Sequence, residues 1–259
     1  MMEDQAMARS TRTKEKFYLL WVLANGFGWP LGWGIGQVVG RVVGVVAFSL
    51  ALAATEALAE GAMPFAPNLA DLSGQGWDLL AASVAAKLIE GAVMGAVVGV
   101  LQWLVLRRRL ARAGWWVPAN MAGWALGQAA GQVIFFRWLL DDRVLLSAAV
   151  WTATAGGVGG LIGTIQWFVL RRRSRRAGWW IPVSTLALAA GWSLPPLPLL
   201  WIQSFLMRPG GGEPFILAVI LFALLALVGE LIFWFVGGGL FGVVTGFPLS
   251  RLTRSPESK

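Results

Sequence analysis

The sequence contains no cysteine and no histidine. Their absence excludes disulfides, thiolate nucleophiles, zinc sites built from these residues, histidine-ligated haem and Ser/His/Asp triads. Catalysis would have to rely on carboxylates, lysine, hydroxyl groups or the single tyrosine, Tyr18. We therefore expect no enzymatic activity, no cofactor and no metal ion.

Charged residues are also scarce. They make up 13% of the 259 residues, whereas 57% are hydrophobic, which is too apolar for a soluble domain of this size. Several apolar stretches reach the length of about 20 residues that a helix needs to cross a bilayer. The polar run before Phe17 lacks the short apolar core of a cleaved signal, so we expect the first apolar segment to be retained as a span.

One segment occurs twice without gaps, at 91–118 and at 155–182. The two copies read GAVMGAVVGVLQWLVLRRRLARAGWWVP and AGGVGGLIGTIQWFVLRRRSRRAGWWIP. Residues 21–32 match residues 116–127, which begin at the end of the first copy. The earlier half of the repeated segment recurs near the C-terminus, where Thr245 and Gly246 replace the Gln-Trp pair. Self-similarity of this kind indicates a fold built from repeated units.

The repeat predicts an all-α, polytopic transmembrane helical bundle with six spans, arranged as three pairs of helices and with both termini cytoplasmic. The predicted organisation is an N-terminal tail at 1–16, repeat units at 17–109, 110–173 and 174–254, and a C-terminal tail at 255–259. The first unit carries an insertion at about 46–76, which prolongs the first helix, forms an interfacial helix or adds a short span.

Positive charges are distributed unevenly along the chain. Of the 21 Lys and Arg residues, four precede Phe17, four lie in 107–112, five in 171–176 and three after Ser250. Segments that lie between spans on the cytoplasmic side carry such an excess of Lys and Arg. An even number of spans returns all four groups to the same side of a bacterial cytoplasmic membrane. The basic groups adjoin spans, so we expect anionic lipids and no nucleic acid as their partners.

Paired tryptophans follow both central arginine clusters. Tryptophan anchors helices at the headgroup level, and guanidinium groups match the geometry of phosphate, so anchoring and headgroup binding are both open interpretations. The candidate headgroup contacts are Gln102, Arg107, Arg108, Trp115, Trp116, Gln166, Arg171, Arg172, Trp179 and Trp180. The two glutamines can instead form hydrogen bonds between helices.

Glycines recur at every fourth position in the apolar segments, for example at Gly28, Gly32 and Gly36. A step of four residues keeps them on one helix face and allows helix backbones to approach closely. Compact, glycine-mediated packing of helices is the expected result.

Three charged residues, Lys87, Glu90 and Glu230, lie within predicted spans. Such charges are costly in lipid, so they pair with one another or mark an ion or substrate site. Lys87 and Glu90 are three residues apart and can share a helix face. Lys87 and Glu230 occupy matching positions in the repeat, so a threefold arrangement would place them at equal depth, where they could neutralise each other.

The string GxxxGxxQWxxLRRxxxxAGWW resembles a motif of uncharacterised bacterial multi-pass membrane proteins of the cyanobacterial and Chloroflexi type. This resemblance implies a bacterial cytoplasmic membrane and no particular activity. The sequence favours a non-enzymatic structural or accessory membrane protein, which would have other membrane subunits as further partners. The alternatives are a small-solute or ion transporter that uses Lys87, Glu90 and Glu230, and a protein that binds or modifies lipid headgroups.

Overall fold

The computed structural model describes residues 2–61, 69–110, 112–138, 144–172, 175–193 and 215–252. These residues form α-helices and two short 3-10 helices, with no strand among them. The α-helices are α1 (Met2–Gly61), α2 (Leu69–Leu106), α3 (Trp116–Trp138), α4 (Val144–Leu170), α5 (Trp180–Ser193) and α7 (Phe215–Leu252). The 3-10 helices η1 (Ala113–Trp115) and η2 (Arg175–Trp179) precede α3 and α5. The prediction of an all-α bundle is confirmed, and the C-terminal tail at 255–259 lies outside the described residues.

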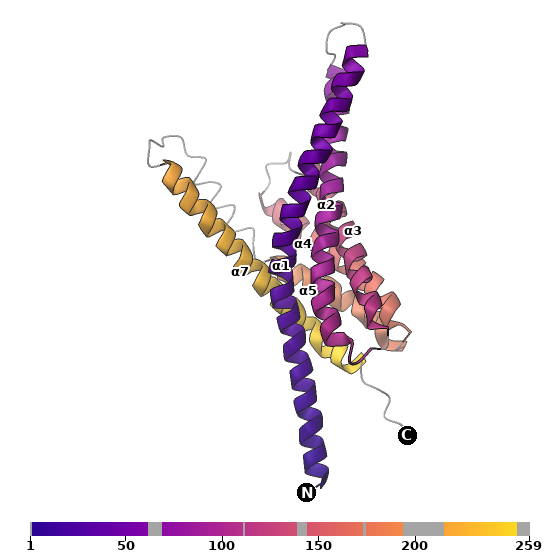
Figure 1. Cartoon of the computed structure of the whole chain (residues 1–259). Helices are drawn as coiled ribbons and strands as arrows, with labels where there is room; N and C mark the ends of the chain where they lie inside the picture. The colour runs from indigo at the N-terminus through magenta and orange to yellow at the C-terminus, as the bar shows by residue number, and fades with distance from the viewer. Residues whose placement is uncertain are drawn as a thin grey trace.

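Each α-helix packs against the next one along the chain, and α7 packs against α1. The helices therefore form a closed ring, in which α7 crosses α1 obliquely (Figure 1). At one end of the ring, Phe17 and Trp21 of α1 belong to one buried cluster with residues in the last turns of α2, α4 and α7 and in the first turns of α3 and α5. Neighbouring helices thus run in opposite directions. We call this end the arginine end, because Arg107, Arg108, Arg109, Arg171 and Arg172 lie there.

The two ends of α1 differ from the predicted boundaries. The predicted N-terminal tail at 1–16 is helical from Met2 onwards and continues into the apolar part of α1 without a break. Of the three alternatives for the insertion at 46–76, the structure has the first, because α1 extends to Gly61 and α2 begins at Leu69. Their distal parts lie side by side, above α3 and α4 in the view of Figure 1.

Four segments in the described part of the chain are long and apolar enough to cross a membrane. They are Thr13–Ala47, Leu80–Leu106, Thr152–Leu170 and Leu227–Ser250. The protein is therefore a helical protein with the composition of a multi-pass membrane protein. Helix α3 does not qualify because Asn120, Gln128 and Gln132 lower its hydropathy, and the described part of α5 has only 14 residues.

Glycines allow the closest approaches in the ring, and these recur at matching repeat positions. A methyl group at Gly95 would lie 2.5 Å from the carbonyl oxygen of Asn120, and one at Gly159 would lie 2.5 Å from that of Ser184. Gly238 lies in the same way against the carbonyl of Asn25, which brings α7 onto α1. These positions admit glycine only, because the neighbouring atoms are backbone and cannot rotate away.

Two adjacent glycines of α7 provide a matched test of this packing. We expect Gly238→Ala to destabilise the protein by about 1–3 kcal/mol, because the new methyl group overpacks the contact with α1. Gly239 has no atom within 4 Å of the corresponding position, so Gly239→Ala should leave the stability unchanged or slightly higher. Thermal unfolding in detergent, followed by circular dichroism, measures both effects, and equal effects would contradict this account of the interface.

Candidate functional site

Three helices meet in a buried hydrogen-bond chain near the arginine end. The indole Nε1 of Trp116 on α3 donates to Oε1 of Gln102 on α2 at 2.6 Å, and Nε2 of Gln102 donates to Oδ1 of Asn25 on α1 at 2.7 Å. Nδ2 of Asn25 donates to the backbone oxygen of Trp21 at 2.8 Å. All three side chains are at most 1% exposed. We call a chain of this kind an amide junction.

A second amide junction joins the next three helices of the ring. Trp180 on α5 donates to Oε1 of Gln166 on α4 at 2.7 Å, and Gln166 donates to Oδ1 of Asn120 on α3 at 3.1 Å. Asn120 in turn donates to the backbone oxygen of Trp116 at 2.9 Å. Every residue of the second junction occupies the position that matches its counterpart in the first.

Each place where three successive helices of the ring meet near the arginine end is called a corner here. The third corner, where α5, α7 and α1 meet, lacks the two amides. Thr245 on α7 replaces the glutamine, and its Oγ1 accepts a hydrogen bond from Nε1 of Trp21 at 2.9 Å. The same hydroxyl donates to the backbone oxygen of Phe241 at 2.6 Å, within its own helix. Ser184 on α5 replaces the asparagine, and its buried Oγ has no hydrogen-bond partner among the described atoms. Helices α5 and α7 are therefore joined without a side-chain bridge at this corner.

The burial of these side chains corrects part of the predicted headgroup site. Gln102, Gln166, Trp116 and Trp180 are at most 1% exposed, so they cannot contact lipid headgroups. Their polar atoms are satisfied inside the ring, where an unpaired amide would be costly. The sequence reasoning also missed Asn25, although asparagine within an apolar helix at a repeated position signals a buried polar partner.

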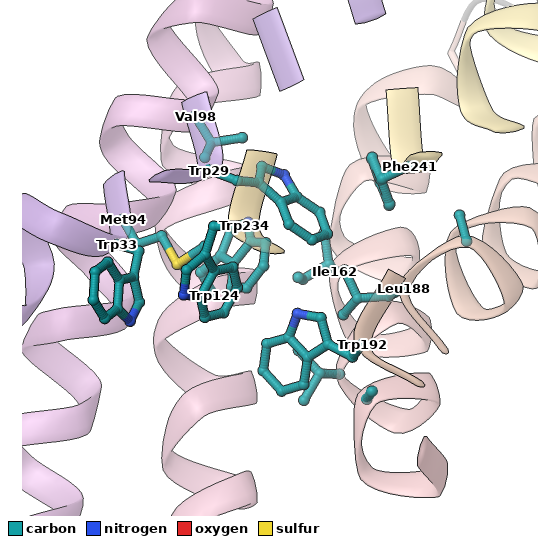
Figure 2. Close-up of a cluster of buried hydrophobic side chains, with 13 residues drawn as sticks. Trp29, Trp33, Met94, Val98, Trp124, Ile162, Leu188, Trp192, Trp234 and Phe241 are labelled. Atoms are coloured by element: carbon teal, nitrogen blue, oxygen red, sulfur yellow. The ribbon is translucent and has the colours of Figure 1, made fainter. Parts of the chain in front are cut away.

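Tryptophan side chains fill the interior of the ring. Trp116 lies between Trp21 and Trp180, with ring centroids 6.1 and 5.9 Å away. Further from the arginine end, Trp29, Trp124, Trp192 and Trp234 form a closed cycle with successive centroid distances of 5.4, 6.4, 5.7 and 6.1 Å. Figure 2 shows this cycle of tryptophans with the aliphatic side chains that pack around it.

Lys87 and Glu90 form the ion pair that their spacing predicts. Nζ of Lys87 lies 2.7 Å from Oε2 of Glu90, whose side chain is 6% exposed, whereas that of Lys87 is 31% exposed. Gln37 of α1, which the sequence reasoning missed, donates from Nε2 to Oε1 of Glu90 at 2.7 Å. The carboxylate is thus held from both sides at the interface of α1 and α2.

Glu230 does not share this ion pair. Within the described part of the chain, no cation lies at ion-pairing distance from its carboxylate. The cations that act on it at longer range are Arg41 and Lys87. Lys87 forms its ion pair with Glu90 on its own helix and acts on Glu230 only at longer range.

The two arginine clusters are partly held by aromatic rings. The guanidinium of Arg107 lies 5.4 Å from the centroid of Trp103, and that of Arg171 lies 5.2 Å from Trp167 at the matching position. Arg109 lies 3.9 Å from the ring of Phe17 and donates to the backbone oxygen of Thr13 at 3.1 Å. Cation–π contacts of this kind orient guanidinium groups while leaving their polar edges available.

Exposed candidates remain at the arginine end. Arg107, Arg108, Arg171 and Arg172 are exposed, as are Trp115 at 65% and Trp179 at 72%. The first tryptophan of each pair therefore points outwards, whereas the second is buried in the ring. This arrangement keeps six of the ten predicted headgroup contacts accessible: Arg107, Arg108, Trp115, Arg171, Arg172 and Trp179.

The chain matches no family model, no curated protein and no solved structure. In the described part of the chain, three sets of polar groups are the candidates for a site: the amide junctions, the charged cluster between α1 and α2, and the arginine end. In the residues that the structure describes, no group of three or more acidic side chains is placed to hold a metal ion. The first set joins helices, and the other two have atoms that reach the surface.

The first amide junction can be tested by removing its central residue. Gln102→Leu leaves Oδ1 of Asn25 and Nε1 of Trp116 buried without partners, so we expect a loss of about 1–3 kcal/mol of stability. Gln128→Leu on α3 is the control, because this side chain is partly exposed and should change stability by less than about 0.5 kcal/mol. Chemical unfolding of both variants in detergent measures the difference, and similar losses would show that the junction contributes nothing specific.

The third corner offers the reverse experiment. Ser184→Asn and Thr245→Gln together restore the residues of the other two corners, so we expect the double variant to unfold at a higher temperature than the wild type. The gain should be about 1 kcal/mol, the net value of a well-formed hydrogen bond. Thr245→Gln alone introduces a buried amide without its acceptor and should lower the stability. A double variant no more stable than that single variant would contradict the equivalence of the three corners.

Proposed function

We propose that this protein is a non-enzymatic integral membrane protein of the bacterial cytoplasmic membrane, with a structural or accessory role. In this proposal the six described α-helices cross the bilayer as three repeated pairs, and the arginine end with both termini lies in the cytoplasm. The observation that carries the proposal is the closed cycle of four tryptophans in the middle of the ring. A ring filled by indoles is a scaffold, because the axis between its helices is occupied by side chains.

The amide junctions support a static role. A buried amide pair fixes both the rotation and the height of the helices that carry it, because any slip leaves polar atoms unpaired in an apolar medium. Two of the three corners are locked in this way, and glycines bring the helices into backbone contact at all three. Rocking of one helix pair against another, as in alternating-access transporters, would break these bonds.

The absence of cysteine makes the proposed topology directly testable. Single cysteines at Gly114 and Gly178, which have open space around them, report on the arginine end. Cysteines at Asp71 and Asp142 report on the opposite side. We expect a membrane-impermeant maleimide to label the second pair in intact spheroplasts and the first pair only after permeabilisation. Labelling of both pairs from the same side would contradict the six-span arrangement.

A transporter is the second candidate, and the charged cluster favours it. Lys87 is partly exposed while Glu90 is buried beside it, and both charges lie within an apolar span. Glu230 adds a carboxylate near Arg41 and Lys87 that has no direct partner among the described residues. Carboxylates within spans commonly belong to ion or proton pathways.

Charge removal distinguishes the two functions. In the structural role, Lys87→Met leaves the Glu90 carboxylate buried with Gln37 as its only partner, so we expect a loss of about 1–2 kcal/mol, which Lys87→Met with Glu90→Gln recovers. Thermal unfolding in detergent is the measurement, and Glu230→Gln is the control with little expected effect. If all three variants keep wild-type stability while solute uptake into proteoliposomes changes, the structural proposal fails and the transporter is favoured.

A further inference from the structure

The first turn after α2 shapes a depression at the arginine end. It has a volume of about 440 Å³, is open on one side, and is lined by Arg112, Gly114, Trp115 and Pro118. Arg112 and Trp115 are exposed, whereas the next residue, Trp116, is fully buried in the first amide junction. The buried indole thus anchors the turn in the ring and leaves the neighbouring side chains at the surface.

Arg112 has an unusual backbone conformation for an arginine. Its φ of 70° and ψ of 28° are left-handed, and it is the only residue other than glycine with positive φ among those described. Glycine or asparagine adopts this conformation at lower cost. The guanidinium makes no hydrogen bond or ion pair with any described residue, so no such contact accounts for an arginine at this left-handed position. Strain of this kind is concentrated at ligand sites.

The residues that line the depression, which lies in the second unit, recur in the sequence of the third unit. Arg176, Gly178, Trp179 and Pro182 match the four residues at the same spacing, and Arg176 and Trp179 are exposed. In the first unit, the matching positions are Phe17, Leu19, Leu20 and Leu23, which have no charge or indole. The pattern therefore occurs twice in the chain.

We propose that each of these two turns binds the phosphate group of one anionic phospholipid. The inference rests on the proposed membrane insertion, with the arginine end at the bilayer surface. A guanidinium binds phosphate through two parallel hydrogen bonds, and an exposed indole beside it lies at the depth of the glycerol and headgroup. The depression is large enough for a headgroup and is open to the protein surface.

Apolar side chains extend each site in the direction that an acyl chain requires. On α3, Met121 and Leu126 follow Pro118 on the exposed face and are 37% and 49% exposed. On α5, Leu186 follows Pro182 and is 68% exposed. A soluble phosphate would use the arginine but not these surfaces, so the ligand is a lipid.

Native mass spectrometry of the full chain tests the stoichiometry. Protein purified in detergent is mixed with phosphatidylglycerol, phosphatidylcholine or glycerol 1-phosphate, and the retained molecules are counted. We expect two phosphatidylglycerol molecules on the wild type, one on Arg112→Gln and none on Arg112→Gln with Arg176→Gln. The dissociation constant of the lost site should rise about tenfold or more.

The matched control is Lys14→Gln with Lys16→Gln. These lysines are exposed on α1 just before Phe17, and they belong neither to the lining pattern nor to the predicted headgroup contacts. The control removes the same two charges and leaves both turns intact, so it should keep both lipids. If the control loses as many lipid molecules, the effect is due to surface charge alone and the proposal is overturned. Equal retention of phosphatidylcholine would also overturn it, as would binding of glycerol 1-phosphate as tight as that of the lipid.

A second variant separates binding from folding. Arg112→Gly removes the guanidinium and relieves the left-handed backbone, so its thermal midpoint should be equal to or higher than that of the wild type while one lipid is lost. Retention of both lipids in this variant would overturn the proposal. Recovery of the wild-type chain in the soluble fraction of cells would instead contradict the proposed membrane function, so the two failures are distinguishable.

Discussion

The constraint on which the structure depends is that an amide buried in an apolar medium must find a partner. Gln102 and Asn25 lie in helices that are otherwise apolar, and only one relative height and rotation lets Gln102 reach both Asn25 and Trp116. The same requirement positions Gln166. Once these heights are set, the glycines of one helix face the backbone of the next, and the tryptophans of alternate helices meet in the interior.

The third corner departs from this rule, and its departure coincides with the other asymmetries of the molecule. Thr245 reaches Trp21 but not Ser184, so α7 is attached to α1 more specifically than to α5. The charged residues Lys87, Glu90 and Glu230 also lie on the first and last units, where their matching positions in the second unit are uncharged. The repeated residues join the helices of the ring, whereas the residues that differ between units place the charged side chains on α2 and α7, the two neighbours of α1.

The basic and aromatic surface at the arginine end follows from the same need to pair the buried amides. Helices α2 and α4 are each followed by arginines, and the next turn must bury one tryptophan of a pair to complete the amide junction. The other tryptophan is then directed outwards beside an arginine. A single structural requirement in the interior therefore produces a basic, aromatic surface that faces lipid headgroups in the proposed orientation.

The sequence alone predicted the helical fold, the repeated segments and the Lys87–Glu90 pair, because hydropathy, identity at a fixed spacing and helical periodicity are local properties. It did not distinguish Trp115 from Trp116. Adjacent helix positions differ by about 100° in direction, and only a neighbouring helix decides which of them is inside. The glutamines were ambiguous for the same reason, since an amide near a helix end serves a headgroup or a partner equally well. The closure of α7 onto α1 and the pairing of Gln37 with Glu90 were decided by tertiary structure, because these contacts join residues far apart in the chain, and no local pattern encodes the height at which two helices pack.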